Sequence, residues 1–383
     1  MNDYRFECLH DFGEFQSIRN DWDEFTHCYF PANYSRTHAW LSAWWTTYHH
    51  GRPALIYLQR RVPDGRIVAV APLFIRKELY GGLPILSLQL LGEGLGADDF
   101  LVSPDARDFV AQVFDDLVNV RRWHVAKLRR LQSPQFCAEV ERAANNLSCA
   151  MEFAETDDYF IEFPDSFETY LQGRTRKFRR NFNQATNRIG KEGVVTVEVL
   201  DPISDAERVI GLGREVAATS WQFQTGKSHF NEFGADCLYG NLARLGRGAG
   251  GEEFTVMLVN GRPAAYLLGC RRGRSYFAVD TAFHADYRHV SVGRLLFGRI
   301  IERLIGLGDV DDFDFEGSGE YKDDYATHSR KAAFLTVYNR NLYSRGIRSL
   351  RNSRWYATLR ERYARMRSGG ERPPAETGQA KGD

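Results

Sequence analysis

A short segment between Arg288 and Gly293 has the residue types and spacing to hold an oxygen-rich anion such as a pyrophosphate. It reads R-x-x-S-x-G and directly precedes an apolar helix expected over 292–307. Backbone N–H groups and the positive end of the helix dipole attract an anion at such a start. Gly293 would let a ligand approach the backbone closely, and Ser291 is expected to cap the helix with its side chain. The residues predicted to contact the anion are Arg288, His289, Val290, Ser291, Val292, Gly293 and Arg294.

A helix start that binds nothing can have the same pattern, because short Gly/Ser patterns are common by chance. The helix itself has Val292, Leu296, Ile300 and Leu304 along one face, so it is expected to pack against a sheet. A helix held in this way keeps its dipole in a fixed place, which suits binding.

A second group of candidate residues follows the next expected strand, in the sequence DFEGSGEYK (314–322). Asp314 and Glu316 alternate with two phenylalanines, so both carboxylates lie on one strand face and the rings on the other. Either carboxylate could accept a proton, and Glu316 is preferred because it borders the Gly-rich loop. The other candidates are Asp280 as a further carboxylate, Tyr321 as a proton donor and Lys322 as an anion ligand. Each could equally be an exposed polar residue, because a sequence does not reveal pKa shifts.

The segment from Arg174 to Lys191 contains seven basic residues and no acidic one. Phe178, Phe182 and Ile189 repeat at helical spacing, so a helix with a solvent-exposed basic face is the simplest interpretation. An alternative is a binding face for an anionic acceptor, such as a nucleotide-sugar or a phosphorylated glycan. A third interpretation is a contact with a tRNA backbone. Because the total charge is balanced, a small acceptor is favoured over tRNA.

The whole chain has the composition of a soluble globular protein. Its 383 residues are 43% hydrophobic and 26% charged, and 50 Lys and Arg residues balance 50 Asp and Glu residues, so no overall basic field points to nucleic acid. No apolar run approaches the roughly 18 residues of a membrane span, and residues 1–10 are not typical of a secretory signal. The six cysteines and ten histidines show no metal-ligand spacing. We therefore expect a cytoplasmic protein without a metal.

The same order of elements is expected twice along the chain. In the first half a hairpin, a third strand, a helix and a further strand are expected over 54–59 with 67–75, 84–91, 105–120 and 125–131. In the second half a hairpin, a third strand, a helix and a further strand are expected over 253–259 with 263–271, 275–281, 292–307 and 312–315. Asp64-Gly65 and Asn260-Gly261 join the two hairpins, and both pairs are hairpin signals. A repeated order of elements indicates two related units.

These units predict an α/β (α+β) fold of two tandem domains, each with a mixed β-sheet flanked by helices. The boundary is expected near 154–164, where the sequence turns acidic before a proline. The predicted division is 1–158, 159–366 and a tail over 367–383, which is rich in Gly, Pro and charge and is expected to be disordered. The first-half loop over 92–96 contains Glu93 and no basic residue, so the first domain is assigned to acceptor recognition or scaffolding.

The order hairpin, strand, R-x-x-S-x-G, helix and strand resembles the GNAT acyl-CoA transferase superfamily, whose pyrophosphate loop reads Q/R-x-x-G-x-G/A. Arg288 and Gly293 match this pattern, and Ser291 stands where the first Gly is usual. The wider sequence is similar to the CelD-like or BioF2-like branch, which is related to the two-domain Fem-type transferases. The segments that carry this resemblance are LSAWW (41–45), RTRKFRRNF (174–182), SWQFQTGK (220–227), YRHVSVGRLL (287–296) and DFEGSGEYK (314–322).

The resemblance implies an N-acyltransferase that uses acetyl-CoA or another acyl-CoA as co-substrate, with its site in the second domain. It implies that a backbone N–H near the end of the strand over 275–281 polarises the thioester carbonyl. The acceptor would be a small-molecule amine, such as an amino sugar or a cell-envelope or exopolysaccharide precursor, and its expected contacts are Arg176, Arg179, Arg180 and Trp221. The alternatives are a Fem-like aminoacyl-tRNA-dependent transferase and a non-catalytic GNAT-fold component of polysaccharide biosynthesis.

The region from Arg340 to Arg367 contains nine arginines and a single acid, Glu361. Apolar residues such as Leu350 and Trp355 are interleaved with them. A terminal helix packed on the second domain is favoured, and a peripheral contact with an anionic membrane surface is the alternative. The sequence does not decide the oligomeric state.

Overall fold

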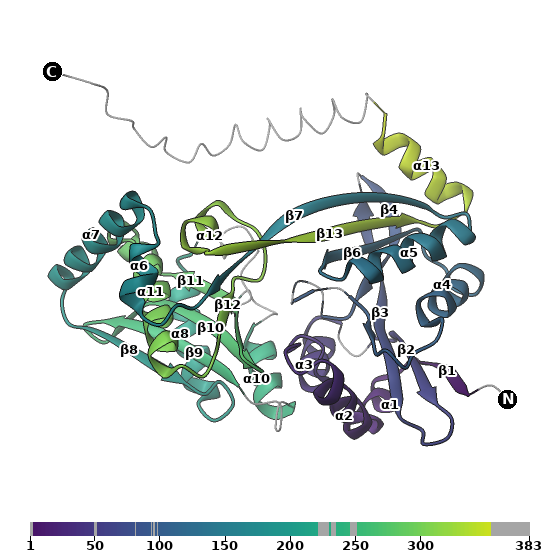
Figure 1. Ribbon diagram of the computed structural model, residues 1–383, viewed down its shortest axis with the longest axis horizontal. Coiled ribbons are helices and arrows are strands. Elements are labelled where there is room, and N and C mark those ends of the chain that lie inside the picture. Colours follow the sequence, from purple (N-terminus) through teal and green to yellow (C-terminus); the bar gives the residue numbers. More distant parts are fainter. Residues whose placement is uncertain are drawn as a thin grey trace.

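The computed structural model describes residues 3–49, 52–80, 82–92, 94, 96–97, 99–220, 230, 235–245 and 251–353. Its helices and strands form two α/β halves that lie side by side (Figure 1). In these described ranges no helix is long and apolar enough to cross a membrane.

The first half begins with a strand and three helices and continues with most of its strands. Its elements are β1 (Tyr4–Leu9), α1 (Phe12–Ser17), α2 (Arg19–Tyr29), α3 (His38–Tyr48), β2 (Leu55–Arg61), β3 (Ile67–Tyr80), β4 (Leu83–Leu90), β5 (Leu101–Val102), α4 (Phe109–Asn119), β6 (Val125–Leu131) and α5 (Pro134–Asn146). The hairpin β2–β3 and the third strand β4 are confirmed. Helices α4 and α5 bury their apolar faces on one side of this sheet, and α1 to α3 pack on the other.

The strand β7 (Ala150–Glu162) leads into the second half. The elements that follow are α6 (Phe167–Gln172), α7 (Arg176–Glu192), β8 (Val195–Leu200), α8 (Ala206–Ala217), α10 (Ala235–Leu245), β9 (Glu252–Val259), β10 (Arg262–Arg272), β11 (Ser275–Phe283), η1 (Ala285–Val290), α11 (Val292–Leu307), β12 (Asp312–Asp314), α12 (Glu320–Tyr325), β13 (His328–Tyr338) and α13 (Leu342–Arg351). The hairpin β9–β10 turns at Asn260 and Gly261, whose φ angles of 52° and 79° are the positive values that favour this pair in tight hairpins. Helices α6, α7 and α11 cover one face of this sheet, and α8 and α10 cover the other.

One mixed sheet of thirteen strands runs through both halves. Its order is β1-β2-β3-β4-β6-β13-β7-β12-β11-β10-β9-β8, with β5 beside β3. The long strand β13 pairs antiparallel with β6 on one side and with β7 on the other, and β7 continues to pair with β12. The β7–β13 ribbon therefore connects the two halves, as Figure 1 shows.

The acidic segment that begins at Ala154 was expected to lie near a domain boundary, but the structure places it within β7. Its charges are matched across the ladder, since Asp157 pairs with Lys331 at 2.9 Å and Asp158 lies opposite Arg330. Such pairs let an acidic segment form a strand. The division of the chain at residues 158 and 159 falls inside this strand and stays a prediction.

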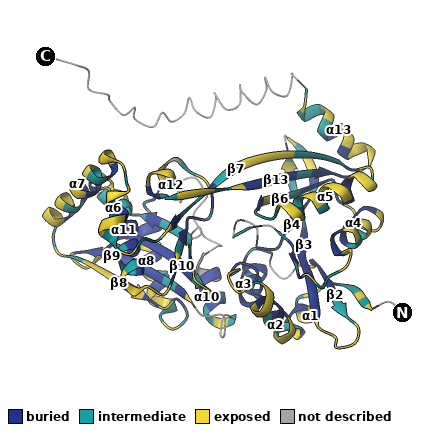
Figure 2. Cartoon of the chain, in the orientation of Figure 1, coloured by how far each residue is buried: buried dark blue, intermediate teal, exposed yellow. Residues whose placement is uncertain are grey.

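The two halves also share a hydrophobic core. Buried side chains of α3, such as Trp40 and Trp45, belong to the same cluster as Tyr239 of α10 and Phe254 of β9. In Figure 2 the strands of both halves are largely buried, while α7 is largely exposed. The halves are thus joined by a sheet and by a core.

The C-terminal helix packs on a different half from the one expected. Ile347 of α13 is buried against Ile85, Val125 and Tyr338, which belong to β4, β6 and β13. The prediction that this helix packs on the second domain is therefore wrong, because β13 brings the chain back to the edge of β6. Residues beyond Ser353, including the predicted tail, lie outside the described residues.

Candidate active site

A cavity of about 400 Å³ lies at the start of α11. Its wall combines the end of β11, the R-x-x-S-x-G segment and α12, and it contains Thr281, Ala282, Phe283, Arg288, Ser291, Val292, Gly293, Arg294, Phe297, Tyr321 and Tyr325. Strand β11 pairs with β12 only over Ser275–Phe277, so its later residues have a free edge on this side. The cavity therefore opens where two neighbouring strands separate. We call it the donor cavity.

The backbone of β11 is irregular beside this cavity. Leu268 of β10 lies opposite Asp280 and Gly269 lies opposite Ala278, so Val279 is an extra residue in the ladder. An extra residue of this kind is left unpaired and disrupts the ladder locally. Val279 lies near the end of β11, the strand whose backbone N–H is expected to polarise the thioester carbonyl.

Ser291 begins α11 in a left-handed conformation, with φ of 55° and ψ of 46°. Its side chain makes no capping hydrogen bond, so the prediction that it caps the helix is wrong. A left-handed residue cannot place its side chain as an extended cap residue does. The amides of Arg294 and Leu295 both donate to the Ser291 carbonyl. The preceding amides, those of Val292 and Gly293, are the ones that a helix start leaves without an intrahelical acceptor.

Gly293 faces the donor cavity, and the surrounding protein does not require a glycine at this position. A β-carbon placed there would meet only the Phe283 ring, at 3.5 Å, which is an ordinary contact. A larger side chain would instead occupy the cavity. The small size of this residue is therefore useful chiefly to a ligand that approaches the backbone.

The other residues of the predicted loop divide into free and anchored ones. Arg288 lies exposed in the cavity wall, and its side chain has no hydrogen-bond or ion-pair partner among the described residues. His289 is anchored by Glu192: its Nε2 lies 2.9 Å from Glu192 Oε1, and this interaction raises the pKa of His289. Arg294 pairs with Asp324 at 3.3 Å and lies over the ring of Tyr325. Val290 and Val292 are buried in the core beneath.

A second cavity, of about 720 Å³, lies between the two halves. Its wall includes residues 29–35 and Arg130 from the first half and Asp314, Glu316 and Arg330 from the second. We call it the interdomain cavity. It contains the two carboxylates that were predicted to accept a proton.

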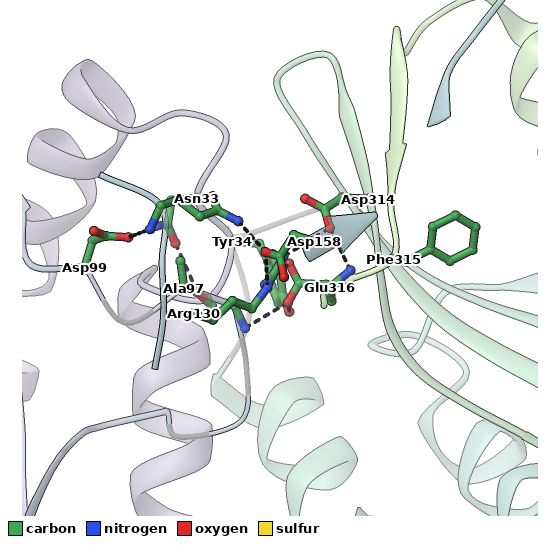
Figure 3. Close-up of polar contacts among 12 residues, drawn as sticks. Asn33, Tyr34, Ala97, Asp99, Arg130, Asp158, Asp314, Phe315 and Glu316 are labelled. Carbon is green, nitrogen blue, oxygen red and sulfur yellow. Dashed lines mark hydrogen bonds and ion pairs between the residues drawn. The ribbon is translucent and has the colours of Figure 1, made fainter. Parts of the chain in front are cut away.

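The Glu316 carboxylate is held by three donors that all come from the first half (Figure 3). Arg130 Nη1 lies 3.0 Å from its Oε1, while the Tyr34 hydroxyl at 2.9 Å and the Gly96 amide at 2.8 Å donate to its Oε2. Burial raises the pKa of Glu316, and the nearby guanidinium and hydroxyl oppose that shift. Its backbone has a φ of 58°, so the residue is held in a left-handed conformation by these contacts.

Arg130 joins three carboxylates in one buried cluster. Its Nε lies 2.7 Å from Asp158, its Nη2 lies 3.1 Å from Asp314 and its Nη1 contacts Glu316. Asp314 is 1% exposed, pairs also with Arg330 and accepts a 2.6 Å hydrogen bond from the Glu316 amide. Asp314 is therefore fully occupied by Arg130, Arg330 and the Glu316 amide, and it orients these neighbours.

The predicted alternation around Asp314 is confirmed. Phe313 and Phe315 are buried in the core under α11, while both carboxylates turn to the Arg130 cluster. Lys322 lies on the same side, where its ammonium donates to the Phe315 carbonyl at 2.8 Å and burial lowers its pKa.

Tyr321 and Asp280 lie apart from this cluster. Tyr321 is 47% exposed in the wall of the donor cavity, and its partial burial raises its pKa. Asp280 accepts hydrogen bonds from Tyr239 at 3.1 Å and Tyr266 at 2.9 Å. It is not among the described residues that line either cavity.

The basic residues of α7 are also remote from both cavities. Arg179 donates to the carbonyls of Leu171, Gln172 and Arg174, so it caps the C-terminal end of α6. Arg176 and Arg180 are exposed, and none of the three lines either cavity. Trp221 lies outside the described residues. Their role as acceptor contacts stays a prediction.

Tyr34, Gly96 and Arg130 are contacts of the site that the sequence reasoning missed. Arg130 follows Ala126 and Leu128 at a period of two, and both of those residues are buried, so the pattern did contain a signal for a buried guanidinium. Gly96 belongs to the loop over 92–96, which was not predicted to bind an anion because it contains Glu93 and no basic residue. Its amide nevertheless donates a hydrogen bond to the Glu316 carboxylate. Nothing local marks Tyr34. Among the described residues no group of His, Cys, Asp and Glu side chains could hold a metal ion.

Residues 176–327 match the family described as Acetyltransferase (GNAT) domain. The second half carries a GNAT domain. The matched segment begins with α7, ends directly before β13, and contains the donor cavity together with Glu316 and Lys322. The GNAT domain thus coincides with the half in which the R-x-x-S-x-G segment was predicted to function. A comparison with curated protein sequences finds no match.

Solved structures resemble most of the chain in fold, at low sequence identity. FemX has a TM-score of 0.54 and 12% identity over 85% of this chain and 97% of its own. The C-terminal domain of a putative lysylphosphatidylglycerol synthetase from Agrobacterium fabrum has a TM-score of 0.53 and 11% identity over 88% of this chain and 97% of its own. L-PGS from Bacillus licheniformis has a TM-score of 0.51 and 13% identity over 86% of this chain and 96% of its own. The predicted mixed α/β fold of two tandem GNAT-like units is therefore confirmed, and residues 176–327 match the acetyltransferase (GNAT) domain family.

Proposed function

We propose that this protein transfers an acyl group from acetyl-CoA or another acyl-CoA to the amine of a small molecule. The observation that supports this most directly is the donor cavity, which lies inside the matched GNAT segment and begins at the Ser291–Gly293 helix start. Its residues fit a pyrophosphate, because two amides at a helix start and the exposed Arg288 guanidinium converge there. An acyl-CoA would supply the activated thioester.

The side chains of the chain would move the protons of this reaction. Glu316 would take the proton that the acceptor ammonium must lose, directly or through water, and its raised pKa suits that exchange. Tyr321, in the wall of the donor cavity, would protonate the leaving sulfur. The extra residue Val279 in β11 supports the proposal that a backbone N–H there polarises the thioester carbonyl. Lys322 and Asp314 would fix the charge around Glu316, and Asp280 would act only through its two tyrosine partners.

The finer assignments rest on sequence resemblance. The CelD-like or BioF2-like branch, an amino-sugar or exopolysaccharide acceptor and a cytoplasmic location stay predictions. A Fem-like transferase that takes its acyl group from aminoacyl-tRNA is the second candidate, favoured by the fold likeness to FemX alone. Binding of CoA separates the two, because only the first requires a pyrophosphate site at α11.

The test is calorimetric titration of acetyl-CoA and CoA into the wild type and Gly293→Trp. The indole of the variant would fill the donor cavity, so we expect affinity to fall by roughly 100-fold or more, as for an interaction of about 3 kcal/mol. Gly306→Trp is the matched control, since Gly306 is exposed on the same helix with nothing within 4 Å of an added β-carbon. Equal affinity of wild type and Gly293→Trp would sink the assignment of the pyrophosphate site.

A further inference from the structure

The interdomain cavity has an excess of negative charge. Its wall contains five carboxylates and two guanidiniums, namely Glu162, Asp311, Asp312, Asp314, Glu316, Arg130 and Arg330. Both guanidiniums are already used within the protein: Arg130 contacts three carboxylates, and Arg330 pairs with Asp314. Asp311 pairs with Arg274 outside the wall, and Glu162 lies 3.6 Å from His328. Among these wall carboxylates, Asp312 is therefore the one without an ion-pair partner among the described residues.

Asp312 is the clearest case of a carboxylate without a cation. Its Oδ2 accepts a 2.8 Å hydrogen bond from the Ser275 hydroxyl, and it forms no ion pair with any described residue. The residue is half-buried, and burial raises its pKa. Behind the wall, Asp158 is 1% exposed, and its Oδ1 has no hydrogen-bond partner in the described part of the chain. Asp158 is already paired with Arg130, so a positive ligand group in the cavity would chiefly offset the cost of the partly buried Asp312 carboxylate.

Aromatic rings form the rest of the surface on which such a group would lie. Tyr34, Phe160, Phe163 and Phe277 all line the cavity. The Phe160 ring already carries a cation, because the Arg330 guanidinium lies 5.4 Å from its centre. Ring faces attract ammonium groups as well as guanidinium groups. The wall thus combines the two features by which proteins recognise organic cations.

The position of the cavity suits the acceptor side of the proposed reaction. Glu316 lies in its wall, and Ser275 and Phe277 come from the same strand, β11, whose end lines the donor cavity. An amine entering between the halves would therefore approach β11 from the side away from α11. The exposed arginines of α7 do not line this path.

We propose that the interdomain cavity binds a small aliphatic amine that carries at least two positive charges, of the diamine or polyamine class, as the acceptor. One ammonium would lie near Asp312, and a second amine would be placed toward Glu316. This proposal rests on the proposed acyl transfer. It differs from an anionic acceptor in the sign of the charge that the site selects.

Direct binding tests the proposal without any acyl donor. Putrescine, spermidine, butylamine and UDP-glucosamine are titrated calorimetrically into the full chain. We expect putrescine and spermidine to bind at least about tenfold more tightly than butylamine, because the second charge interacts with Asp312. Asp312→Asn should weaken putrescine binding about tenfold, and Glu207→Gln, an exposed carboxylate of α8, should leave it unchanged.

A second pair of variants keeps the test decisive if Asp312→Asn fails to fold. Ala32→Trp places an indole in the cavity from an exposed position, and Glu162→Gln removes a mostly exposed carboxylate of the wall. Putrescine binding should be lost in the first and weakened in the second. Equal affinity in wild type and Ala32→Trp, or tighter binding of UDP-glucosamine than of spermidine, would overturn the proposal.

These outcomes are separable from those of the donor site. If CoA binds and Gly293→Trp abolishes that binding, while putrescine does not bind, the acyl transfer proposal stands and the diamine proposal fails. If putrescine binds with the expected dependence on Asp312 while CoA does not, the cavity is a cation site and the acyl-CoA proposal fails.

Discussion

At the scale of single residues, the site is built around a buried carboxylate whose partners come from the other half of the chain. Glu316 contacts the Arg130 guanidinium, the Tyr34 hydroxyl and the Gly96 amide, which all lie in the first half of the chain. A buried carboxylate is costly unless it is paired and hydrogen-bonded. The first half therefore sets the charge of a residue that lies in the GNAT domain.

Replacement of Tyr34 by Phe should move the pH dependence of the reaction. The hydroxyl donates to the carboxylate and so lowers the pKa of Glu316 against the effect of burial. Without it the carboxylate form is less stable, the pKa rises, and the base is protonated at higher pH. We expect the acid-side limb of the rate profile to move upward by about one pH unit, the value of one hydrogen bond to a charged group.

The control for this shift is Tyr57→Phe. Tyr57 is a buried tyrosine that donates to Asp116 at 2.6 Å, away from the Glu316 cluster. Both variants lose a tyrosine–carboxylate bond, and only Tyr34→Phe should alter the profile of rate against pH. An unmoved limb in Tyr34→Phe, or the same shift in both, would argue against Glu316 as the titrating base.

What the sequence reveals at this scale depends on how local the signal is. The alternation of Asp314 and Glu316 with Phe313 and Phe315 could be predicted from the expected strand over 312–315, although β12 itself ends at Asp314 and Glu316 has a φ of 58°. The pairing of Glu316 with Tyr34 could not, because it depends on how two distant segments meet. A carboxylate expected to border an open loop is in fact enclosed by the other half.

At the scale of elements, the start of α11 explains why its sequence differs from the usual pattern. The residue at 291 has a φ of 55°, a conformation that glycine adopts without strain and that other residues adopt at a cost. Serine tolerates the position because its small side chain lies exposed. The helix start is therefore kept without the first glycine.

Variants at Ser291 test this account. Ser291→Gly should change the free energy of unfolding by less than about 1 kcal/mol, because the relief of strain is offset by the greater freedom of the unfolded chain. Ser291→Val should destabilise by about 1–2 kcal/mol, since a β-branched residue is unfavourable at positive φ. Chemical denaturation measures both values. A Val variant as stable as the Gly variant would show that the left-handed conformation is not maintained.

Elements defined by local signals were predicted well. Asp64-Gly65 and Asn260-Gly261 mark their hairpins, and α11 follows its apolar period. The short elements β1, η1 and α12 were missed, as was the full length of β7. These depend on partners elsewhere in the sheet, and the acidic sequence of β7 becomes a strand only beside Lys331 and Arg330 of β13.

At the scale of the molecule, the two halves form one structural unit. β13 lies between β6 and β7, and one hydrophobic cluster contains Trp45 of the first half and Tyr239 of the second. The last described elements of the chain therefore involve both halves, since β13 pairs with β6 and β7 and α13 packs on the first half, although they follow the GNAT match in sequence. Neither half can complete its part of the sheet without them.

This arrangement predicts that a chain ending at Thr327, where the GNAT match stops, does not fold. Removal of β13 leaves β6 and β7 without their shared partner and removes buried residues such as Leu335, Val337 and Ile347. Burial of each such side chain contributes roughly 1.5–3 kcal/mol, so their loss approaches the typical stability of a whole domain, about 5–15 kcal/mol. We expect circular dichroism of the truncated chain to show no cooperative thermal transition.

The matched control is a chain ending at Ser353, which keeps β13 and α13 and omits only residues beyond the described ones. It should melt in one cooperative transition, with the tryptophan signal, to which five of the six tryptophans in 1–353 contribute from the first half, changing together with the far-ultraviolet signal of both halves. A separate transition for each half in this control would contradict a shared core. A cooperative transition in the chain ending at Thr327 would show instead that the GNAT domain is stable without the strand that connects it to the first half.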